Sequence, residues 1–256
     1  DITADKASVE GGKDVTYTAT TNEGEGHASR GLIIEDPKML QIPAALQVGK
    51  NYSYALWFKA NKLAHDKQGT NLISKNTVKD RWPHNNWGDL WVQIRPEVTD
   101  KYKNKVHPAN EISFNTMGWT AHDNPNFDMI STDYSITPGV WNHLVVCHND
   151  GNIQTMYLNG RKVAQVAFTN SIRREDSRDG RIQIYQPADI FIGGGGVYKS
   201  GFNGVIDEVQ IWNRELSESD VQRAMKGFKE GEVPEGLMGY FTFETKEGES
   251  VFPNLG

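Results

Sequence analysis

The sequence predicts an all-β protein: an antiparallel β-sandwich with one short helix. Several segments alternate between apolar and polar residues, which is the pattern of strands with one buried face. The chain also contains 25 glycines and 10% aromatic residues, a composition typical of short strands joined by tight turns. With 256 residues it can form one large β domain or two small ones.

The alternation is clearest at residues 52–60 and 141–147. The sequences "NDGN" at 149–152 and "NG" at 159–160 favour the positive backbone angles of hairpin turns. Consecutive antiparallel strands are therefore expected from Trp141 to Thr169. Further strands are expected at "MLQIP", "NLISK", "DLWVQIRP", "EISFNT", "RIQIY", "DIFIGGG" and "GVIDEVQIWN".

One helix is expected directly after Leu216. Ser217 is a good N-cap with Asp220 three residues later, and an apolar residue follows at Val221. Gly227 provides the glycine that commonly ends a helix. The helix is short and lies at the surface.

The charge balance excludes some classes of partner. The chain has 27 basic and 33 acidic residues, giving a net charge of −6, which argues against nucleic acid. No apolar run approaches the ~18–20 residues of a membrane span. The single cysteine, Cys147, cannot form an internal disulfide and is expected to be a buried strand thiol.

Two adjacent acids, Asp207 and Glu208, interrupt an apolar strand pattern. Neighbouring strand residues point to opposite faces, so Asp207 is expected on the core side and Glu208 on the other. The two carboxylates of a glycosidase must converge within about 5–9.5 Å across one bond, which this pair cannot do. The expected faces are Asp207 with Val205, Val209 and Ile211, and Glu208 with Ile206, Gln210 and Trp212.

Other catalytic patterns are missing from the sequence. There is no Gly-x-Ser-x-Gly elbow, and the histidines, cysteine and carboxylates show no zinc-type spacing. His143 and His148 are expected to face opposite ways on their strand and to be structural. The chain is therefore not expected to be an enzyme.

Two long polar loops are the candidate ligand site. Sugar binding needs flat aromatic faces beside hydrogen-bonding side chains, often on loops that a rigid sheet supports. The alternative is that one or two of the loop tryptophans only cap the sandwich edge, while Trp57, Trp91 and Trp141 are assigned to the core. The candidate ligand-binding residues are Arg81, Trp82, His84, Asn86, Trp87, Asp89, Trp119, His122, Asp123 and Asn126.

Four separated motifs carry a resemblance to a known family. The stretch "GFNGVIDEVQIWNRELSESDVQ" resembles the closing motif of the laminin-G-like, concanavalin A-like jelly-roll family. The segments "MLQIPAALQVGKNYSYALWFKAN", "TPGVWNHLVVCHNDGNIQTMYLNGRKVA" and "IFIGGG" are similar to family motifs in the family's order. The resemblance covers residues 31–227 and implies an antiparallel jelly-roll sandwich.

The chain departs from the family pattern at its two ends. The family's opening strand does not precede Gly31, but the segment 236–256 resembles it. The expected domain is therefore 31–256, with the strand in 237–245 packed into it because an unpaired apolar strand would favour aggregation. The alternative is that this segment begins a truncated tandem module. Residues 1–30 are expected to be an extension that adds a strand, or a truncated immunoglobulin-like or polycystic-kidney-disease-type fragment.

The resemblance also implies one structural calcium ion. In the family, calcium is held by the aspartate of "IDEV", here Asp207, and by acidic residues before the early strand. Glu35 and Asp36 occupy that place, with glutamate where aspartate is usual. The alternative is that Asp207 is hydrogen-bonded or ion-paired without a metal.

These observations predict a non-catalytic carbohydrate-binding module of a secreted or surface-attached bacterial protein, periplasmic or attached to the outer membrane. Its expected partners are a glycan or polysaccharide, and neighbouring domains of the same chain. A structural spacer or protein-adhesion module is the second possibility. A glycoside hydrolase of the same fold is the third.

Overall fold

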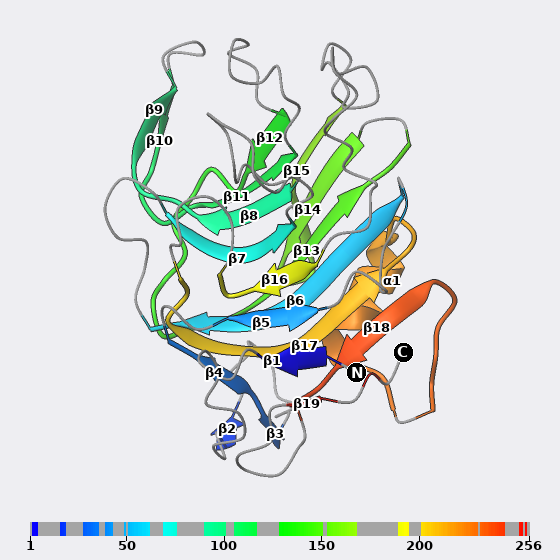
Figure 1. The fold of residues 1–256 in the computed structure, drawn as a ribbon. Helices are drawn as coiled ribbons and strands as arrows, with labels where there is room; N and C mark the ends of the chain where they lie inside the picture. The colour runs from blue at the N-terminus through cyan, green and yellow to red at the C-terminus, as the bar shows by residue number, and fades with distance from the viewer. Residues whose placement is uncertain are drawn as a thin grey trace.

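The computed structural model describes residues 2–4, 16–18, 28–35, 39–42, 49, 51–61, 69–75, 90–100, 105–116, 128–150, 153–167, 189–194, 201–229, 231–243, 251–252 and 254. An eight-stranded sheet, sheet A, faces a seven-stranded sheet, sheet B (Figure 1). The strand pairs are antiparallel. The predicted all-β jelly-roll sandwich with one short helix is therefore confirmed.

Sheet A consists, in spatial order, of β12 (Asp128–Ser131), β11 (Ile112–Thr116), β8 (Leu90–Ile94), β7 (Thr70–Lys75), β16 (Ile190–Ile192), β5 (Leu40–Ile42), β1 (Ile2–Ala4) and β19 (Val251–Phe252). Sheet B consists of β15 (Arg161–Ala167), β14 (Ile153–Leu158), β13 (Trp141–His148), β6 (Tyr52–Ala60), β17 (Gly204–Trp212) and β18 (Leu237–Phe241), and β4 (Leu32–Ile34) also pairs with β17. Two hairpins lie apart, β9 (Val98–Asp100) with β10 (Lys105–His107), and β2 (Thr16–Thr18) with β3 (Ala28–Arg30). The predicted strand "RIQIY" lies outside the described residues.

The main core lies between the two sheets. On β8, Leu90, Val92 and Ile94 point into it, while the residues between them point away. On β13, the inward residues include Leu144 and Val146. This two-residue period follows from the pleat of each strand, and it confirms the alternation predicted for β13.

The central strand β17 breaks that period with a bulge. Asp207 pairs with Trp57 but Gln210 pairs with Ala55, so β17 has one residue more than β6 between these pairs. Glu208 has a φ of 52°, the left-handed backbone angle that accommodates such an extra residue.

The bulge changes which side chains share a face. Ile206, Val209 and Ile211 all belong to the core between the sheets. Asp207 lies opposite Trp57 on the outer face of sheet B, and Glu208 contacts Tyr240 on that same face. The expectation that Asp207 shares the core side with Val209 and Ile211, and that Glu208 shares a face with Ile206, is therefore wrong. A uniform period of two cannot hold across an inserted residue.

Helix α1 (Glu218–Lys226) covers the outer face of sheet B and forms a second apolar cluster there. Val221 and Ala224 of the helix are buried in this cluster with Trp212. The last turn also hydrogen-bonds to the sheet: the Gln210 side chain donates to the Ala224 carbonyl at 2.9 Å, and the Trp57 indole to the Met225 carbonyl at 3.2 Å. These donors satisfy carbonyls that the end of a helix leaves open.

The start of α1 has the predicted capping box. The Asp220 amide donates to the Ser217 hydroxyl at 3.2 Å, and the Ser217 amide donates to the Asp220 carboxylate at 3.1 Å. Gly227 ends the helix with a φ of 73°, as its position in the sequence predicted.

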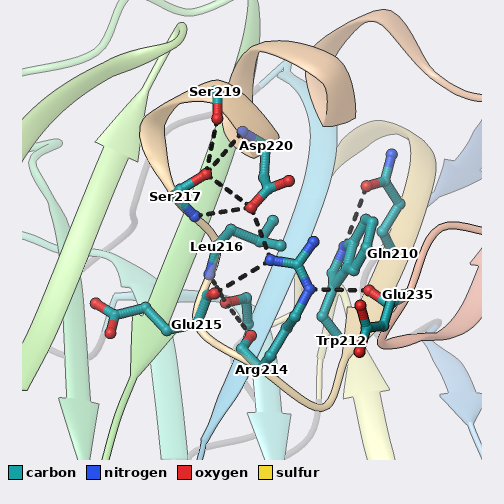
Figure 2. Close-up of polar contacts among 10 residues, drawn as sticks. Gln210, Trp212, Arg214, Glu215, Leu216, Ser217, Ser219, Asp220 and Glu235 are labelled. Carbon is teal, nitrogen blue, oxygen red and sulfur yellow. Dashed lines mark hydrogen bonds and ion pairs between the residues drawn. The ribbon is translucent and has the colours of Figure 1, made fainter.

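Arg214 connects this cap to the rest of the fold (Figure 2). Its guanidinium donates to the Asp220 carboxylate at 2.7 Å and to the Glu235 carbonyl at 2.8 Å. It also lies over the Trp212 ring, 5.3 Å from the centroid. The hydrogen bond from Arg214 holds the pKa of Asp220 well below its usual range.

The described histidines and cysteine of β13 are structural. His143 packs against Trp57 on the outer face in a tilted arrangement, with ring centroids 5.1 Å apart, while His148 stacks against Tyr52 on the inner side at 5.3 Å. They face opposite ways, as predicted. Cys147 is buried, and burial raises the pKa of its thiol to about 11. In the described part of the chain, no helix has the length and apolar character needed to cross a membrane.

We expect Asp220→Ala to lower the free energy of unfolding by about 1–2 kcal/mol, because it removes the capping box and the Arg214 partner together. Urea unfolding followed by circular dichroism measures this. Glu218→Ala is the matched control, since Glu218 contacts only the exposed Lys162 at 3.4 Å among the ion pairs of the described residues. Its effect should stay within about 0.5 kcal/mol. Equal losses in both variants would contradict the role assigned to Asp220.

His143 should make the fold sensitive to acid. Burial lowers the pKa of its imidazole from 6.5 to about 3, so the unfolded chain binds a proton that the folded chain does not. The free energy of unfolding therefore keeps its full value above pH 6.5 and falls as the pH decreases towards 3, because protonation of His143 favours the unfolded chain. In His143→Phe, the slope of unfolding free energy against pH should be shallower by up to about 1.4 kcal/mol per pH unit in this window. Urea unfolding at a series of pH values measures the slope, and an unchanged slope would refute the assignment.

Candidate functional site

The strand register of sheet A places the ends of two connecting segments at one end of the sheet. Lys75 pairs with Leu90, Leu90 with Thr116, and Thr116 with Asp128. The segment 76–89 joins β7 to β8, and the segment 117–127 joins β11 to β12. Both segments therefore leave and re-enter the same end of neighbouring strands.

These two segments contain the predicted ligand-binding residues. All of those residues lie outside the described part of the chain, so the prediction for their side chains is neither supported nor contradicted. They are Arg81, Trp82, His84, Asn86, Trp87, Asp89, Trp119, His122, Asp123 and Asn126.

The outer face of sheet A, which points away from sheet B, is polar and aromatic. On β8 and β11 alternate side chains enter the core, so the residues between them lie on this outer face. On β7 the register shifts between Asn71 and Ile73, and the consecutive residues Leu72 and Ile73 both enter the core. The cross-strand pairs align the outward residues in two rows. One row is Gln41, Phe191, Ser74, Trp91 and Asn115, and the other is Asn71, Gln93, Ser113 and Ser131.

Amide and hydroxyl groups of this outer face bond to one another. The side-chain amide of Gln93 donates to the side-chain oxygen of Asn71 at 2.7 Å, and the side-chain amide of Asn115 donates to the Ser113 hydroxyl at 3.1 Å. These bonds fix the side chains and give the face directional donors and acceptors next to flat aromatic rings. Most of these side chains are buried, with Ser74 and Ser113 at 0% exposure and Asn115 at 7%, whereas Gln41, Gln93 and Phe191 are half-buried. Groups of these types stack on sugar rings and hydrogen-bond to sugar hydroxyls where a ligand reaches them.

Trp91 is the tryptophan at the centre of this face. It lies between Ser74 and Asn115 and belongs to none of the apolar clusters, although only 9% of its surface is exposed. Trp91 is buried, as a core assignment predicts, but its strand position faces away from the space between the two sheets. Trp57 and Trp141 are buried as expected, but in a small cluster with Val205 on the outer face of sheet B.

A charged cluster lies at the opposite end of β11 and β12 from the two segments. The Nδ1 atom of His107 is 3.0 Å from Oε1 of Glu111 and 3.8 Å from Oδ1 of Asp133. Ser131 donates to Asp133 at 2.9 Å, and Arg95 lies 3.7 Å from Glu111. His107 and Glu111 are buried, whereas Asp133 is exposed.

Sequence reasoning missed this cluster. Metal-binding motifs are recognised in a sequence by short, fixed spacings between ligands. Asp133, however, is 22 residues beyond Glu111 and comes close to it only through the pairing of β11 with β12. The available signal was the histidine and glutamate of "HPANE", four residues apart across a turn.

Of the three residues expected to hold calcium, the structure describes Glu35 and Asp207, so the site stays a prediction. The pairing of β4 with β17 runs from Leu32 opposite Ile206 to Ile34 opposite Gly204. Asp207 therefore lies beyond one end of β4 and Glu35 beyond the other, about 13 Å apart at strand spacing. Asp207 accepts a hydrogen bond from the Glu208 amide at 2.8 Å. Asp36 lies outside the described residues.

The acid pair Asp207 and Glu208 is buried beneath α1, with exposures of 0% and 9%. Tyr240 donates its hydroxyl to Glu208, and burial together with the Glu208 charge raises the pKa of Tyr240. A Cβ atom on Gly227 would lie 2.9 Å from the Glu208 carboxylate, so the end of α1 closes directly over it. Both acids share one face, but they are packed inside the fold.

Comparison with solved structures shows the same fold in carbohydrate-binding domains. Domain 4 of AbnA, an extracellular GH43 arabinanase of Geobacillus stearothermophilus solved with arabinotriose, matches with a TM-score of 0.53 and 18% identity over 85% of this chain and 86% of that one. The CBM40 of the Ruminococcus gnavus IT-sialidase, bound to α2,3-sialyllactose, matches with a TM-score of 0.55 and 12% identity over 77% and 96%.

The binding domain of botulinum neurotoxin serotype D also matches, with a TM-score of 0.55 and 14% identity over 88% of this chain. This chain spans about half of that structure, 46% of its length. At these identities the likeness shows a shared fold. No curated protein matches the chain.

A laminin G-type family model described as "Concanavalin A-like lectin/glucanases superfamily" matches residues 38–222. The match spans most of sheets A and B and ends within α1. The chain therefore belongs to the concanavalin A-like lectin/glucanase superfamily.

Proposed function

We propose that this chain is a carbohydrate-binding module without catalytic activity of its own. Its ligand would lie on the outer face of sheet A, at the end from which the segments 76–89 and 117–127 leave their strands. One observation carries the proposal: the register from Lys75 to Asp128 puts the residues that flank both tryptophan-containing segments at the same end of this sheet.

The chemistry of the face supports a sugar ligand. Trp91 and Phe191 offer aromatic rings among the amides of Gln93 and Asn115. The nearby segments would add Trp82, Trp87 and Trp119 with several Asn, Asp, Arg and His side chains. Aromatic rings stack on the apolar faces of sugars, and amides and carboxylates bond to their hydroxyls.

The structural neighbours support the same ligand class. Two of them were solved with an oligosaccharide bound, arabinotriose in one and sialyllactose in the other. We infer that an oligosaccharide or polysaccharide is also the ligand of this chain. Such a ligand would be met by a secreted or surface-attached protein.

Burial of the acid pair supports a binding role over hydrolysis. The acids of a glycosidase must line a groove that the substrate can enter. Asp207 and Glu208 instead lie under α1, on the face of sheet B opposite to the core.

We also propose that residues 31–256 form one domain to which the N-terminal residues contribute a strand. In support of this, β18 pairs with β17 in sheet B, and β1 pairs with both β5 and β19 in sheet A. The segment 237–245 would then be packed into the domain rather than begin a second one.

A glycan array with the wild-type protein should identify at least one bound carbohydrate. Isothermal titration with that carbohydrate should show at least a tenfold weaker affinity, about 1.4 kcal/mol, for the triple variant Trp82→Ala, Trp87→Ala, Trp119→Ala and for Asn115→Ala. Tyr134→Ala is the control, because this exposed aromatic residue follows the opposite end of β12. Absence of binding to any glycan would favour a spacer or protein-adhesion module instead.

No reducing sugar should be released from mixed polysaccharides by the wild-type protein. Release of reducing sugar that persists in the double variant Asp207→Asn, Glu208→Gln would point to a glycosidase site elsewhere in the fold. Release that is lost in this variant, with an unchanged circular dichroism spectrum, would assign catalysis to the acid pair. Either result would overturn the non-catalytic proposal.

A further inference from the structure

We propose that His107, Glu111 and Asp133 form a binding site for a divalent transition-metal ion, for which Zn²⁺ is the best fit. The proposal is independent of carbohydrate binding. It rests on the fixed backbone around the three residues and on the positions of their ligand atoms. It also rests on a buried carboxylate oxygen of Glu111 that accepts no hydrogen bond from the described residues.

The backbone holds the first two ligands together through a tight turn. His107 ends β10, and Glu111 directly precedes β11. Asn110 between them has a φ of 68°, and its amide donates to the Arg95 carbonyl at 2.6 Å. The Arg95 amide in turn donates to the Glu111 carbonyl at 2.9 Å, so the turn is tied to the end of β8.

The third ligand comes from a second turn that is tied to the first. Asp133 follows β12 with a φ of 61°. The neighbouring Thr132 donates its amide to the Ile112 carbonyl at 2.9 Å, and its hydroxyl accepts from the Ile112 amide at 3.1 Å. A site built from such fixed turns is prepared before an ion arrives.

The ligand atoms are spaced as an ion requires. One atom each from the three side chains, all within 4.8 Å of one another, can face a common point. Zinc binds nitrogen and oxygen at about 2.0–2.2 Å, which places tetrahedral ligands about 3.3–3.6 Å apart. The observed separations from His107 Nδ1, 3.0 Å to Glu111 and 3.8 Å to Asp133, bracket that range.

The Glu111 carboxylate is compensated only in part: its Oε2 atom is hydrogen-bonded to His107 Nδ1 at 3.2 Å, and its other oxygen lacks a hydrogen bond within the described part of the chain. The Glu111 side chain is 0% exposed, and its Oε1 atom has no hydrogen-bond donor of acceptable geometry among the described residues. Arg95 is 3.7 Å from this atom, an ion-pair distance beyond that of a hydrogen bond. A buried carboxylate is costly without full compensation, and an ion between Oε1 and the His107 ring would provide it.

The donor set selects the class of metal. An imidazole nitrogen with carboxylates suits zinc and its neighbours, whereas calcium prefers oxygen ligands alone. Two carboxylates would neutralise the two charges of the ion. The Asp133 side chain is 56% exposed, which leaves a route for the ion and room for a water ligand. The Ser131 hydroxyl, 2.9 Å from the Asp133 carboxylate, would orient that ligand.

The test uses the full chain after treatment with a chelator. Zn²⁺ added at about one hundred times its dissociation constant should raise the melting temperature by about 5–10 °C. Calcium at the same concentration should leave it unchanged. Substitution with Co²⁺ should produce the visible absorption bands of tetrahedrally coordinated cobalt. A wild-type protein that zinc does not stabilise would refute the proposal.

Variants locate the ion. Asp133→Asn and His107→Gln should each weaken zinc binding at least tenfold in isothermal titration. Asp150→Asn, an exposed acid in the turn after β13, is the matched control and should bind zinc as the wild type does. Because the Asp133 side chain is largely exposed, the Asp133→Asn variant should fold, and it tests the site even if His107→Gln fails to fold. Unchanged zinc affinity in Asp133→Asn would place the ion elsewhere and overturn the assignment.

Discussion

The pleat of sheet A is the constraint on which the rest of the structure depends. On β8 and β11 every second side chain enters the core, so the side chains between them form an outer face. On β8 this sends Leu90, Val92 and Ile94 inward, and sends Trp91 and Gln93 outward. The polar face is therefore a direct result of filling the core, and the same rigid strands hold both the tryptophan-containing segments and the His107 cluster.

Sheet B buries side chains on both of its faces. Its central strand, β17, is buried along its whole length because α1 covers the face that does not meet sheet A. The cover is held by the capping box at one end of α1 and by Gln210 and Trp57 at the other. Arg214 joins the cap to the Glu235 carbonyl. The outer faces of the two sheets thus differ in chemistry: the face of sheet B packs an apolar cluster against α1, and the face of sheet A carries polar side chains that are mostly buried.

Much of the fold followed from local patterns. The helix could be predicted because Ser217 and Gly227 act on their own neighbours, and the strands because alternation is a local property. The bulge at Glu208 could not be predicted, since nothing in "VIDEVQ" marks an extra residue until β6 is placed beside it. The cluster of His107 with Asp133 was equally hidden, because strand pairing alone brings these distant residues together. The ligand residues of the two long segments remain a prediction.

The difference between these two outer faces also separates the chromophores of the protein. Trp57, Trp141 and Trp212 are buried beneath or beside α1, while Trp91 lies on the far side of the sandwich. The four tryptophans of the described residues therefore report on two separate places in the fold. Occupancy of the outer face of sheet A would perturb the emission of Trp91, and undocking of the helix would perturb that of Trp57, Trp141 and Trp212. Two variants, each retaining the tryptophans of one place, could follow the two events separately.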